Sequence, residues 1–295
     1  MAIPSSWNRS ANPAVIEVNS LTKSYGALKV VKGLSLTIDS GEIFAILGPN
    51  GAGKTTTVEI LEGFRTADSG EISVLNTDPA IKGAAALAWR NRIGIVLQST
   101  QDTAELTVRE AITHFASYYS NPREVEEVIS LVGLQEKADD RARTLSGGQR
   151  RRLDVGLGIV GRPELLFLDE PTTGFDPEAR RAFWVLIKKL RDEGTTILLT
   201  THYLDEAEAL ADRVAVMNHG EILEISTPSQ LGGRADSQAT VSWREGGLLK
   251  NEKTDSPTEF VKSLSTRLGG EIPELSIHRP TLEDIYLSMI GATHE

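Results

Sequence analysis

An unbroken apolar run at residues 43–47 leads directly into a glycine-rich segment, residues 48–55. Such a run predicts a strand that is buried on both faces, as in a parallel sheet. The glycine-rich segment matches the phosphate-binding pattern G-x-x-x-x-G-K-[ST], and residues 55–61 are expected to form a helix. A strand, a glycine loop and a helix in this order can hold the phosphates of a nucleotide. The chain is therefore expected to be an α/β protein of the P-loop type.

The sequence contains further candidate strands of two kinds. Apolar runs that predict buried parallel strands recur at residues 93–97, 165–168, 197–199 and 214–217. The first three end next to Gln98, Asp169 and His202. These side chains should converge, because ligands of open parallel sheets bind beyond the carboxyl ends of the strands. The alternating patterns at residues 15–18 and 34–38 instead predict an antiparallel β subdomain.

Helical patterns divide the rest of the chain. Apolar residues at helical spacing in residues 125–132 predict a helical subdomain, at about residues 100–160, that is inserted into the sheet domain. Residues 14–232 are thus expected to form one domain, preceded by an extension of residues 1–13. From residue 233 the composition becomes polar, and short patterns there predict a small α+β appendage, residues 233–295. Within it, residues 256–259 have the sequence of a capping box that begins a helix.

The composition excludes several classes of function. The 295 residues contain no cysteine, which rules out disulfides, zinc–thiolate sites and thiol catalysis. A formal net charge of −10 argues against non-specific nucleic-acid binding. No apolar run approaches the roughly 20 residues that span a bilayer, and residues 1–13 carry no apolar signal segment. A membrane pathway served by this chain would therefore have to be another polypeptide.

One local cluster of charge differs from the acidic balance of the chain. Five arginines lie close together in the sequence, namely Arg141, Arg143, Arg150, Arg151 and Arg152. Because Asp139, Asp140 and Asp154 are near them, the simplest interpretation is a solvated helix start. A contact surface for a partner protein is the alternative.

Two motifs follow the phosphate loop in a fixed order. They are Leu-Ser-Gly-Gly-Gln at residues 145–149 and Leu-Leu-Phe-Leu-Asp-Glu at residues 165–170. With these motifs the chain resembles the ATP-binding-cassette (ABC) ATPases, and in particular the nucleotide-binding subunits of ABC transporters. The resemblance is strong over residues 15–230. Three further segments are similar to those of the drug-export (daunorubicin-resistance-like) branch, at residues 172–177, 201–207 and 280–286.

The phosphate loop and Asp169 carry a chemical interpretation of their own. Glycines let the backbone wrap closely around phosphates, so the expected ATP-binding residues are Gly48, Pro49, Asn50, Gly51, Ala52, Gly53, Lys54, Thr55 and Thr56. Lys54 would supply a positive charge to the β- and γ-phosphates, and the Thr55 hydroxyl can bind Mg²⁺. Asp169 ends an apolar strand, where a carboxylate is costly unless a cation is near. Mg²⁺ is the natural partner, directly or through water.

The resemblance implies the roles of four further side chains. Glu170 would be the general base that orients the attacking water, and Gln98 would contact the metal and that water. His202 would be the switch histidine that touches the γ-phosphate. Tyr25 would stack on adenine. Taken alone, each residue also has a purely structural interpretation, which for Tyr25 is a place in the core.

Residues 146–149 stand at a predicted helix start, which makes a second anion-binding surface of Ser146, Gly147, Gly148 and Gln149. The resemblance implies that this segment closes over ATP held by a second copy of the chain in a head-to-tail dimer. Asp176 would lie at the dimer interface. Phe175 stands where the family more commonly has leucine, a departure compatible with the drug-export branch.

The expected function is ATP hydrolysis, with ATP and Mg²⁺ bound, by a subunit at the cytoplasmic face of the cell membrane. The subunit would power a separate membrane permease that exports drug-like or lipid-like compounds, and it would bind no nucleic acid. Alternatives are a subunit that exports polysaccharide, lipid or ions, an importer subunit, and a soluble ABC ATPase of DNA repair or translation. Repair members carry long coiled coils or zinc-binding cysteines, and translation members usually fuse two cassettes. Neither feature is present here.

A non-catalytic ATP-binding regulator is a further alternative from a different class. It is disfavoured because the residues that would carry catalysis are all present, namely Lys54, Asp169, Glu170 and His202.

Overall fold

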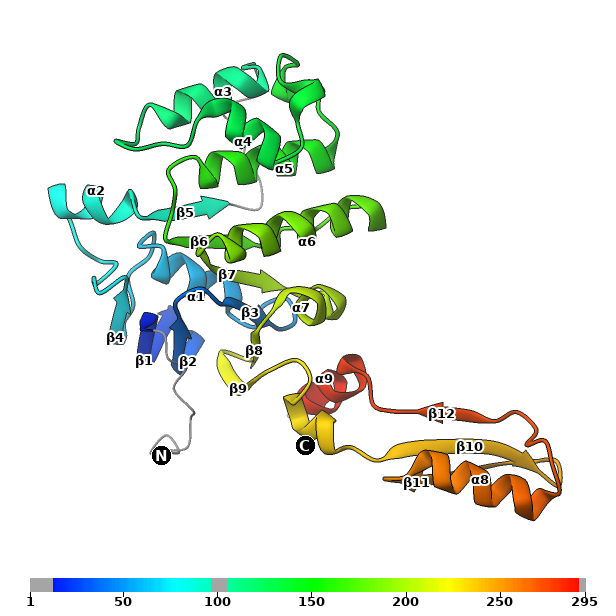
Figure 1. Ribbon diagram of the computed structural model, residues 1–295. Helices are drawn as coiled ribbons and strands as arrows, with labels where there is room; N and C mark the ends of the chain where they lie inside the picture. The colour runs from blue at the N-terminus through cyan, green and yellow to red at the C-terminus, as the bar shows by residue number, and fades with distance from the viewer. Residues whose placement is uncertain (1–12, 97–104, 292–295) are drawn as a thin grey trace. The chain divides into compact units, whose positions relative to one another are not determined.

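The computed structural model describes residues 13–96 and 105–291 (Figure 1). The chain forms two compact units, Met1–Ile225 and Ser226–Glu295. The change in sequence composition places the domain boundary slightly later, after residue 232. No described helix is long and apolar enough to cross a membrane.

The first unit is built on a sheet of six strands in the order β5-β6-β7-β3-β8-β9. Pairing is parallel between β5 and β6, β6 and β7, β7 and β3, and β3 and β8. Every residue of β3 and β7 is buried, as the unbroken apolar runs predict. The strands are β3 (Ile43–Leu47), β5 (Ile93–Val96), β6 (Leu165–Asp169), β7 (Thr196–Thr201), β8 (Arg213–Asn218) and β9 (Glu221–Ser226).

A second sheet of three antiparallel strands has the order β2-β1-β4. Its strands are β1 (Ala14–Tyr25), β2 (Leu28–Asp39) and β4 (Ser69–Val74). Ile16 of β1 lies opposite Ile38 of β2, and both side chains are fully buried. They share one apolar core with Phe44 and Phe167 of the parallel sheet and Leu61 of α1 (Lys54–Leu61). The predicted antiparallel β subdomain is therefore confirmed.

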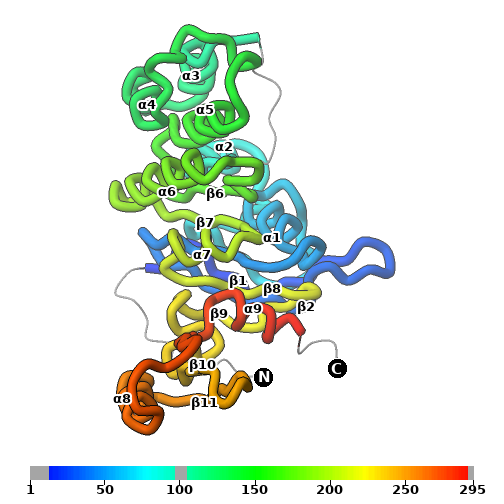
Figure 2. The backbone as a smooth tube through the Cα atoms, turned by 90° about the vertical axis from the view of Figure 1, so that its right-hand side faces the viewer, coloured from blue at the N-terminus to red at the C-terminus, as the bar shows by residue number. Residues whose placement is uncertain are grey.

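The helices between β5 and β6 form the helical subdomain that the sequence predicts. Figures 1 and 2 both show α3 (Val108–Ala116), α4 (Val125–Leu131) and α5 (Gly147–Ile159) grouped together and away from α1. Capping boxes begin α3, with Thr107 and Glu110, and α5, with Ser146 and Gln149. The remaining helices of this unit are α2 (Ala84–Arg90), α6 (Pro177–Asp192) and α7 (Leu204–Leu210).

The second unit contains a three-stranded antiparallel sheet of order β11-β10-β12. Val241 and Trp243 of β10 pack with Leu264 of α8 in a small core. Its elements are η3 (Leu231–Asp236), β10 (Ala239–Glu245), β11 (Leu248–Thr254), α8 (Pro257–Leu268), β12 (Ser276–His278) and α9 (Leu282–Gly291). The helix predicted after residue 256 is present, but Ser256 makes no side-chain cap hydrogen bond, so the expected capping box is wrong. Pro257 at the first helical position sets the start without one.

Candidate nucleotide-binding site

The phosphate loop folds tightly between β3 and α1. Gly51 and Gly53 have φ values of 79° and 102°, in the left-handed region that favours glycine. A Cβ atom at Gly48 would lie 2.3 Å from the carbonyl oxygen of Met217, and one at Gly53 would lie 2.7 Å from that of Val30. Glycine is therefore required at these turns, which leaves the backbone N–H groups free of side-chain cover.

Lys54 begins α1 and lies in the mouth of the loop with 5% of its surface exposed. Its Nζ atom donates to the carbonyl oxygens of Gly48, at 2.9 Å, and Pro49, at 3.2 Å. Burial lowers the pKa of Lys54, and the nearby carboxylates of Glu170 and Asp169 act in the opposite direction. The ammonium group therefore lies within the loop where a bound phosphate would be contacted.

Asp169, the last residue of β6, meets two hydroxyl groups. Thr200 Oγ1 donates to its Oδ1 atom at 2.5 Å, and Thr55 Oγ1 lies 3.5 Å from its Oδ2 atom. These are hard oxygen donors, and Mg²⁺ prefers oxygen ligands from one or two protein groups together with phosphates and water. The residues present thus fit a magnesium ion. Gln98, the other expected ligand, lies outside the described residues.

Glu170 occupies the centre of the cluster. Its Oε1 atom lies 3.7 Å from Lys54 Nζ and 3.4 Å from His202 Nδ1. Its φ value is 44°, which is unfavourable for a residue with a side chain, and its N–H is held by the Oγ1 of Thr200 at 3.1 Å. Backbone strain of this kind costs on the order of 1–3 kcal/mol and is typical of functional sites.

His202 follows the end of β7, and its ring lies 4.1 Å, centroid to centroid, from that of Tyr203. Its Nδ1 atom is buried and makes no hydrogen bond among the described residues, although Glu170 is its nearest acid. Two of the three strand-end residues singled out in the sequence, Asp169 and His202, thus meet beside Lys54, together with Glu170, which the resemblance indicated. Thr200 carried no signal in the sequence beyond its position next to them.

Tyr25, the last residue of β1, is 41% exposed, so the alternative that it is a core residue is wrong. Cations lie near its ring: the guanidinium of Arg65 is 5.6 Å and the Nζ atom of Lys23 is 5.7 Å from the ring centroid. Both distances are within the range of cation–π attraction. The ring is held at the surface, where a base could stack on it.

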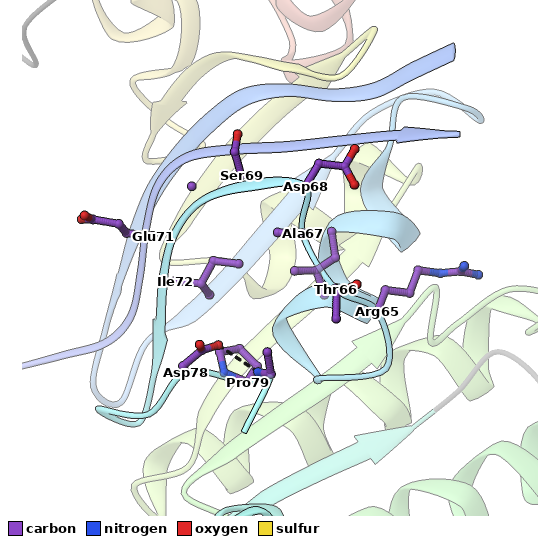
Figure 3. A pocket seen from close by; sticks show the side chains of 12 residues that line it. Arg65, Thr66, Ala67, Asp68, Ser69, Glu71, Ile72, Asp78 and Pro79 are labelled. Atoms are coloured by element: carbon purple, nitrogen blue, oxygen red, sulfur yellow. Dashed lines mark hydrogen bonds between the residues drawn. The ribbon is translucent and has the colours of Figure 1, made fainter. Parts of the chain in front are cut away.

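A cavity of about 470 Å³ lies beside this region, between the end of α1 and β4 (Figure 3). Two of its charged lining residues, Arg65 and Asp68, are engaged in ion pairs. Arg65 binds Glu59, and Asp68 accepts from Lys23 Nζ at 2.9 Å and from the Ser24 N–H at 2.6 Å. Because these groups serve one another, we assign no ligand to the cavity.

The Leu-Ser-Gly-Gly-Gln motif forms the start of α5 with an open surface. The Oγ atom of Ser146 accepts from the Gln149 N–H at 3.3 Å, and Gln149 Oε1 accepts from the Ser146 N–H at 2.9 Å. A Cβ atom at Gly147 would meet nothing within 4 Å, whereas one at Gly148 would contact Ala179 at 3.5 Å. Asp176 is exposed, and its carboxylate caps α6 by accepting from the N–H groups of residues 178 and 179.

One member of the arginine cluster departs from the solvated helix start that the sequence suggested, whereas Arg141 and Arg143 are exposed. Arg151 is only 6% exposed, and its guanidinium binds backbone carbonyl oxygens of the loop after β6. The local pattern missed this because helix α5 buries one side against the sheet domain, and Arg151 falls on that side. The interpretation as a solvated helix start is therefore wrong for Arg151.

Glu62, immediately after α1, is a titratable group of the site that the sequence did not indicate. It is 5% exposed. Burial raises its pKa from the usual 4.5 to about 8, and repulsion from the carboxylates of Asp169 and Glu59 adds to this. In the absence of a cation at Asp169, Glu62 is therefore protonated at neutral pH.

This raised pKa predicts a pH-dependent stability. Protonated Glu62 favours the folded state, so its contribution is complete below pH 4.5 and is lost as the pH rises through about 8. Glu62→Gln should raise the melting temperature of the EDTA-treated, nucleotide-free protein at pH 8, by about 2–4 °C for each kcal/mol that the ionised carboxylate costs the folded state. The difference should vanish near pH 5. A shift that is equal at both pH values, or one reproduced by the exposed control Glu71→Gln, would contradict the assignment.

The fold and this site define a P-loop nucleotide-hydrolysing cassette. Residues 31–173 match the family described as ABC transporter. The Nod factor export ATP-binding protein I of Rhizobium meliloti is 45% identical over 303 residues, which cover 95% of this chain and 90% of that protein. The linearmycin resistance ATP-binding protein of Bacillus subtilis is 37% identical, over 95% of this chain and 99% of that one.

Two further kinds of relative agree with this. The daunorubicin/doxorubicin resistance ATP-binding protein of Streptomyces peucetius is 34% identical, over 94% of this chain and 92% of that one. The ADP conformation of an ATP-binding cassette of an ABC transporter superposes with a TM-score of 0.65 at 27% identity, over 73% of this chain and 91% of that one. The structure of an ATP-binding subunit of an ABC transporter superposes with a TM-score of 0.66 at 25% identity, over 75% of this chain and 93% of that one. The chain belongs to the ATP-binding proteins of the ABC transporter family and is an ATPase of that family.

Proposed function

We propose that this chain hydrolyses Mg²⁺-ATP with Glu170 as general base and thereby drives a separate membrane permease. The observation that carries the proposal is the position of the Glu170 carboxylate. It lies 3.7 Å from Lys54 Nζ and 3.4 Å from His202 Nδ1, one residue after Asp169. A base at this place can reach a water molecule next to the terminal phosphate of a nucleotide held by the phosphate loop.

Each residue of the site would have its own role in hydrolysis. The N–H groups of residues 48 and 50–53 and the N-terminus of α1 hold the β- and γ-phosphates, and Lys54 exchanges its two carbonyl partners for phosphate oxygens. Thr55 and Asp169 would hold Mg²⁺, together with Gln98, and the ion neutralises charge on the phosphates when it is bound. Glu170 orients water and accepts its proton as the oxygen attacks the γ-phosphorus and ADP leaves. His202 would keep Glu170 aligned and contact the γ-phosphate.

The adenine ring of ATP would be held by stacking. Tyr25 is exposed at the end of β1, where adenine would lie against its ring. Stacking of a base on an aromatic ring contributes roughly 1–3 kcal/mol and hardly discriminates between bases. Arg65 and Lys23 hold the Tyr25 ring in place by cation–π contacts.

A second copy of the chain completes each site in this proposal. Residues 146–149 present an open helix N-terminus, which attracts anions, and α5 is grouped with α3 and α4, away from α1 (Figure 2). The segment is therefore available to close over the γ-phosphate of ATP bound to the partner in a head-to-tail dimer. Asp176, exposed at the start of α6, would lie at the dimer interface.

The relatives support export as the direction of transport. Their names refer to Nod factor export, linearmycin resistance and daunorubicin/doxorubicin resistance. Accordingly, we propose a drug-like or lipid-like cargo, a permease formed by another polypeptide, and a position at the cytoplasmic face of the membrane. The cargo would contact the permease, so this chain's residues do not select it.

Purification of the tagged chain from membranes of its own host tests the proposal. A polytopic membrane protein should co-purify, and the pair in proteoliposomes should move cargo only when ATP is on the side of this chain. Glu170→Gln should remove transport while the pair stays assembled. ATP hydrolysis with no membrane partner and no transport would contradict the transporter role and would leave a non-transport ATPase.

Deletion of residues 236–295 tests the role of the appendage. The deleted region holds none of the proposed nucleotide-binding residues, so the truncated protein should bind ATP within about twofold of the full chain. If the appendage stabilises the assembly, truncation should weaken dimerisation or transport. Measuring nucleotide affinity and transport in the same proteoliposomes separates an effect on ATP binding from an effect on assembly or transport. Lost ATP binding would show that the domain boundary at residue 232 is wrong.

A further inference from the structure

A buried arginine connects the start of α5 to the loop that carries Glu170. Arg151 is 6% exposed. Its Nη2 atom donates to the carbonyl oxygen of Asp169 at 2.8 Å, and its Nε atom donates to that of Pro171 at 3.0 Å. These two carbonyls belong to the residues on either side of Glu170. One guanidinium thus spans the peptide segment of the proposed general base.

The segment that Arg151 spans has a backbone conformation that needs support. Glu170 has a φ of 44°, a left-handed value that costs a residue with a side chain on the order of 1–3 kcal/mol. Such a conformation persists only where neighbouring groups hold it. Thr200 fixes the Glu170 N–H at 3.1 Å, while Arg151 fixes the carbonyls before and after it.

Buried acidic groups lie close enough to attract the guanidinium. Asp154, one turn further along α5, and Glu206 of α7 both attract Arg151, and both are buried, with exposures of 6% and 0%. Glu206 also lies near the hydroxyl of Thr172 and the indole of Trp184, although no hydrogen bond joins these buried groups within the described chain. Arg151 therefore links α5 to the end of β6 and the loop after it, within the attraction of Glu206 on α7.

Arg151 lies close to residues 146–149 on α5, so its hydrogen bonds connect that segment to the backbone around Glu170. Two residues separate it from Gly148, so it stands in the same first turns of helix as the anion-binding segment 146–149. A helix transmits displacement rigidly over such a distance, because its backbone hydrogen bonds tie successive turns together. A shift of residues 146–149 against a partner's nucleotide would therefore move the carbonyls beside Glu170.

We propose that Arg151 is a positioning residue that sets the orientation of Glu170 and couples it to closure of the 146–149 segment over the nucleotide of a second subunit. This inference rests on the proposed function. The guanidinium suits the task because it is planar and carries several N–H groups in a fixed arrangement, so it can bind two carbonyls at once. A lysine ammonium in its place cannot hold both with the same geometry.

Arg151→Met and Arg151→Lys test the proposal in the full-length protein. Both should reduce kcat for ATP by about 10–100-fold, the usual effect of misplacing a reacting group by about 1 Å. The KM for ATP and the affinity of the monomer for ATP should change by less than about twofold, because no phosphate-loop contact is touched. Arg152→Met is the matched control: among the described residues, its side chain donates to the Gly133 carbonyl oxygen at 3.3 Å and to no group of the site, so kcat should stay within twofold.

Combination with Glu170→Gln separates positioning from general structural damage. Because Arg151 acts through Glu170, adding Arg151→Met to Glu170→Gln should cost no further activity. Losses that multiply would overturn the proposal, as would full kcat in a folded Arg151→Met variant. If the methionine variant does not fold, the lysine variant decides the question. If neither folds, the guanidinium serves core stability alone and the proposal is wrong.

The proposed roles of Glu170 and Arg151 can be refuted separately. If Glu170→Gln leaves hydrolysis unchanged, the proposed role of Glu170 is wrong, and so is a positioning role of Arg151 that acts through it. If Glu170→Gln abolishes hydrolysis but both Arg151 variants turn over ATP like the Arg152→Met control, only the positioning role is refuted.

Discussion

Replacing Glu170 with glutamine should reduce the turnover of ATP by about 10²–10⁴-fold, the share that a general base contributes. Glutamine keeps the size of the side chain but cannot accept a proton from water. Lys54 retains its two carbonyl contacts within the loop, so Mg²⁺-ATP should bind with nearly unchanged affinity. Steady-state phosphate release and equilibrium binding of a fluorescent ATP analogue measure the two quantities.

A surface carboxylate provides the control for this experiment. Glu221→Gln, at the exposed start of β9, removes the same charge away from the site and should leave turnover unchanged. Hydrolysis at the wild-type rate in Glu170→Gln would exclude Glu170 as the base. A parallel loss of ATP binding would show that the carboxylate supports the loop rather than the reaction.

The second large effect is expected from Gly147→Asp. The Cβ atom of a new side chain meets nothing within 4 Å, so the monomer should fold as before. A carboxylate at a helix N-terminus is even mildly stabilising, by about 0.3–1 kcal/mol. In a closed dimer the same carboxylate would face the γ-phosphate of the partner's nucleotide. ATP-driven dimerisation and ATPase activity should therefore be lost, while the monomer still binds ATP.

Gly147→Asn separates charge from size. The amide fills the same space without a negative charge, so this variant should retain more dimerisation and activity than Gly147→Asp. Equal loss of ATP binding in the Gly147→Asp monomer would mean that residues 146–149 act within their own chain and not across an interface.

The parts of the site that the sequence could predict are those encoded by neighbouring residues. The run of residues 43–47, the glycine loop and the helix after it form one continuous segment, and its fold follows from local rules. Asp169 and His202 were found because each lies at the end of a buried strand, and strand ends of a parallel sheet meet at one edge. The family resemblance supplied roles that these local signals do not contain.

The features that could not be predicted from the sequence depend on contacts between distant segments. Glu62 looked like an ordinary helix end, and only the packing of α1 near Asp169 buries it. Arg151 was one of five arginines in an apparently solvated cluster, and only the tertiary fold selects it for burial beside the carbonyls of Asp169 and Pro171. The order of the six strands likewise reflects non-local pairing.

We propose that ATP joins two copies of this chain through the phosphate loop of one and residues 146–149 of the other. Light scattering of the Glu170→Gln protein after gel filtration, with and without Mg²⁺-ATP, tests it most directly. We expect a monomer without nucleotide, a dimer with Mg²⁺-ATP, and a monomer under both conditions when Gly147→Asp is added. A Glu170→Gln protein that stays monomeric with saturating Mg²⁺-ATP, or a double variant that still dimerises, would contradict it.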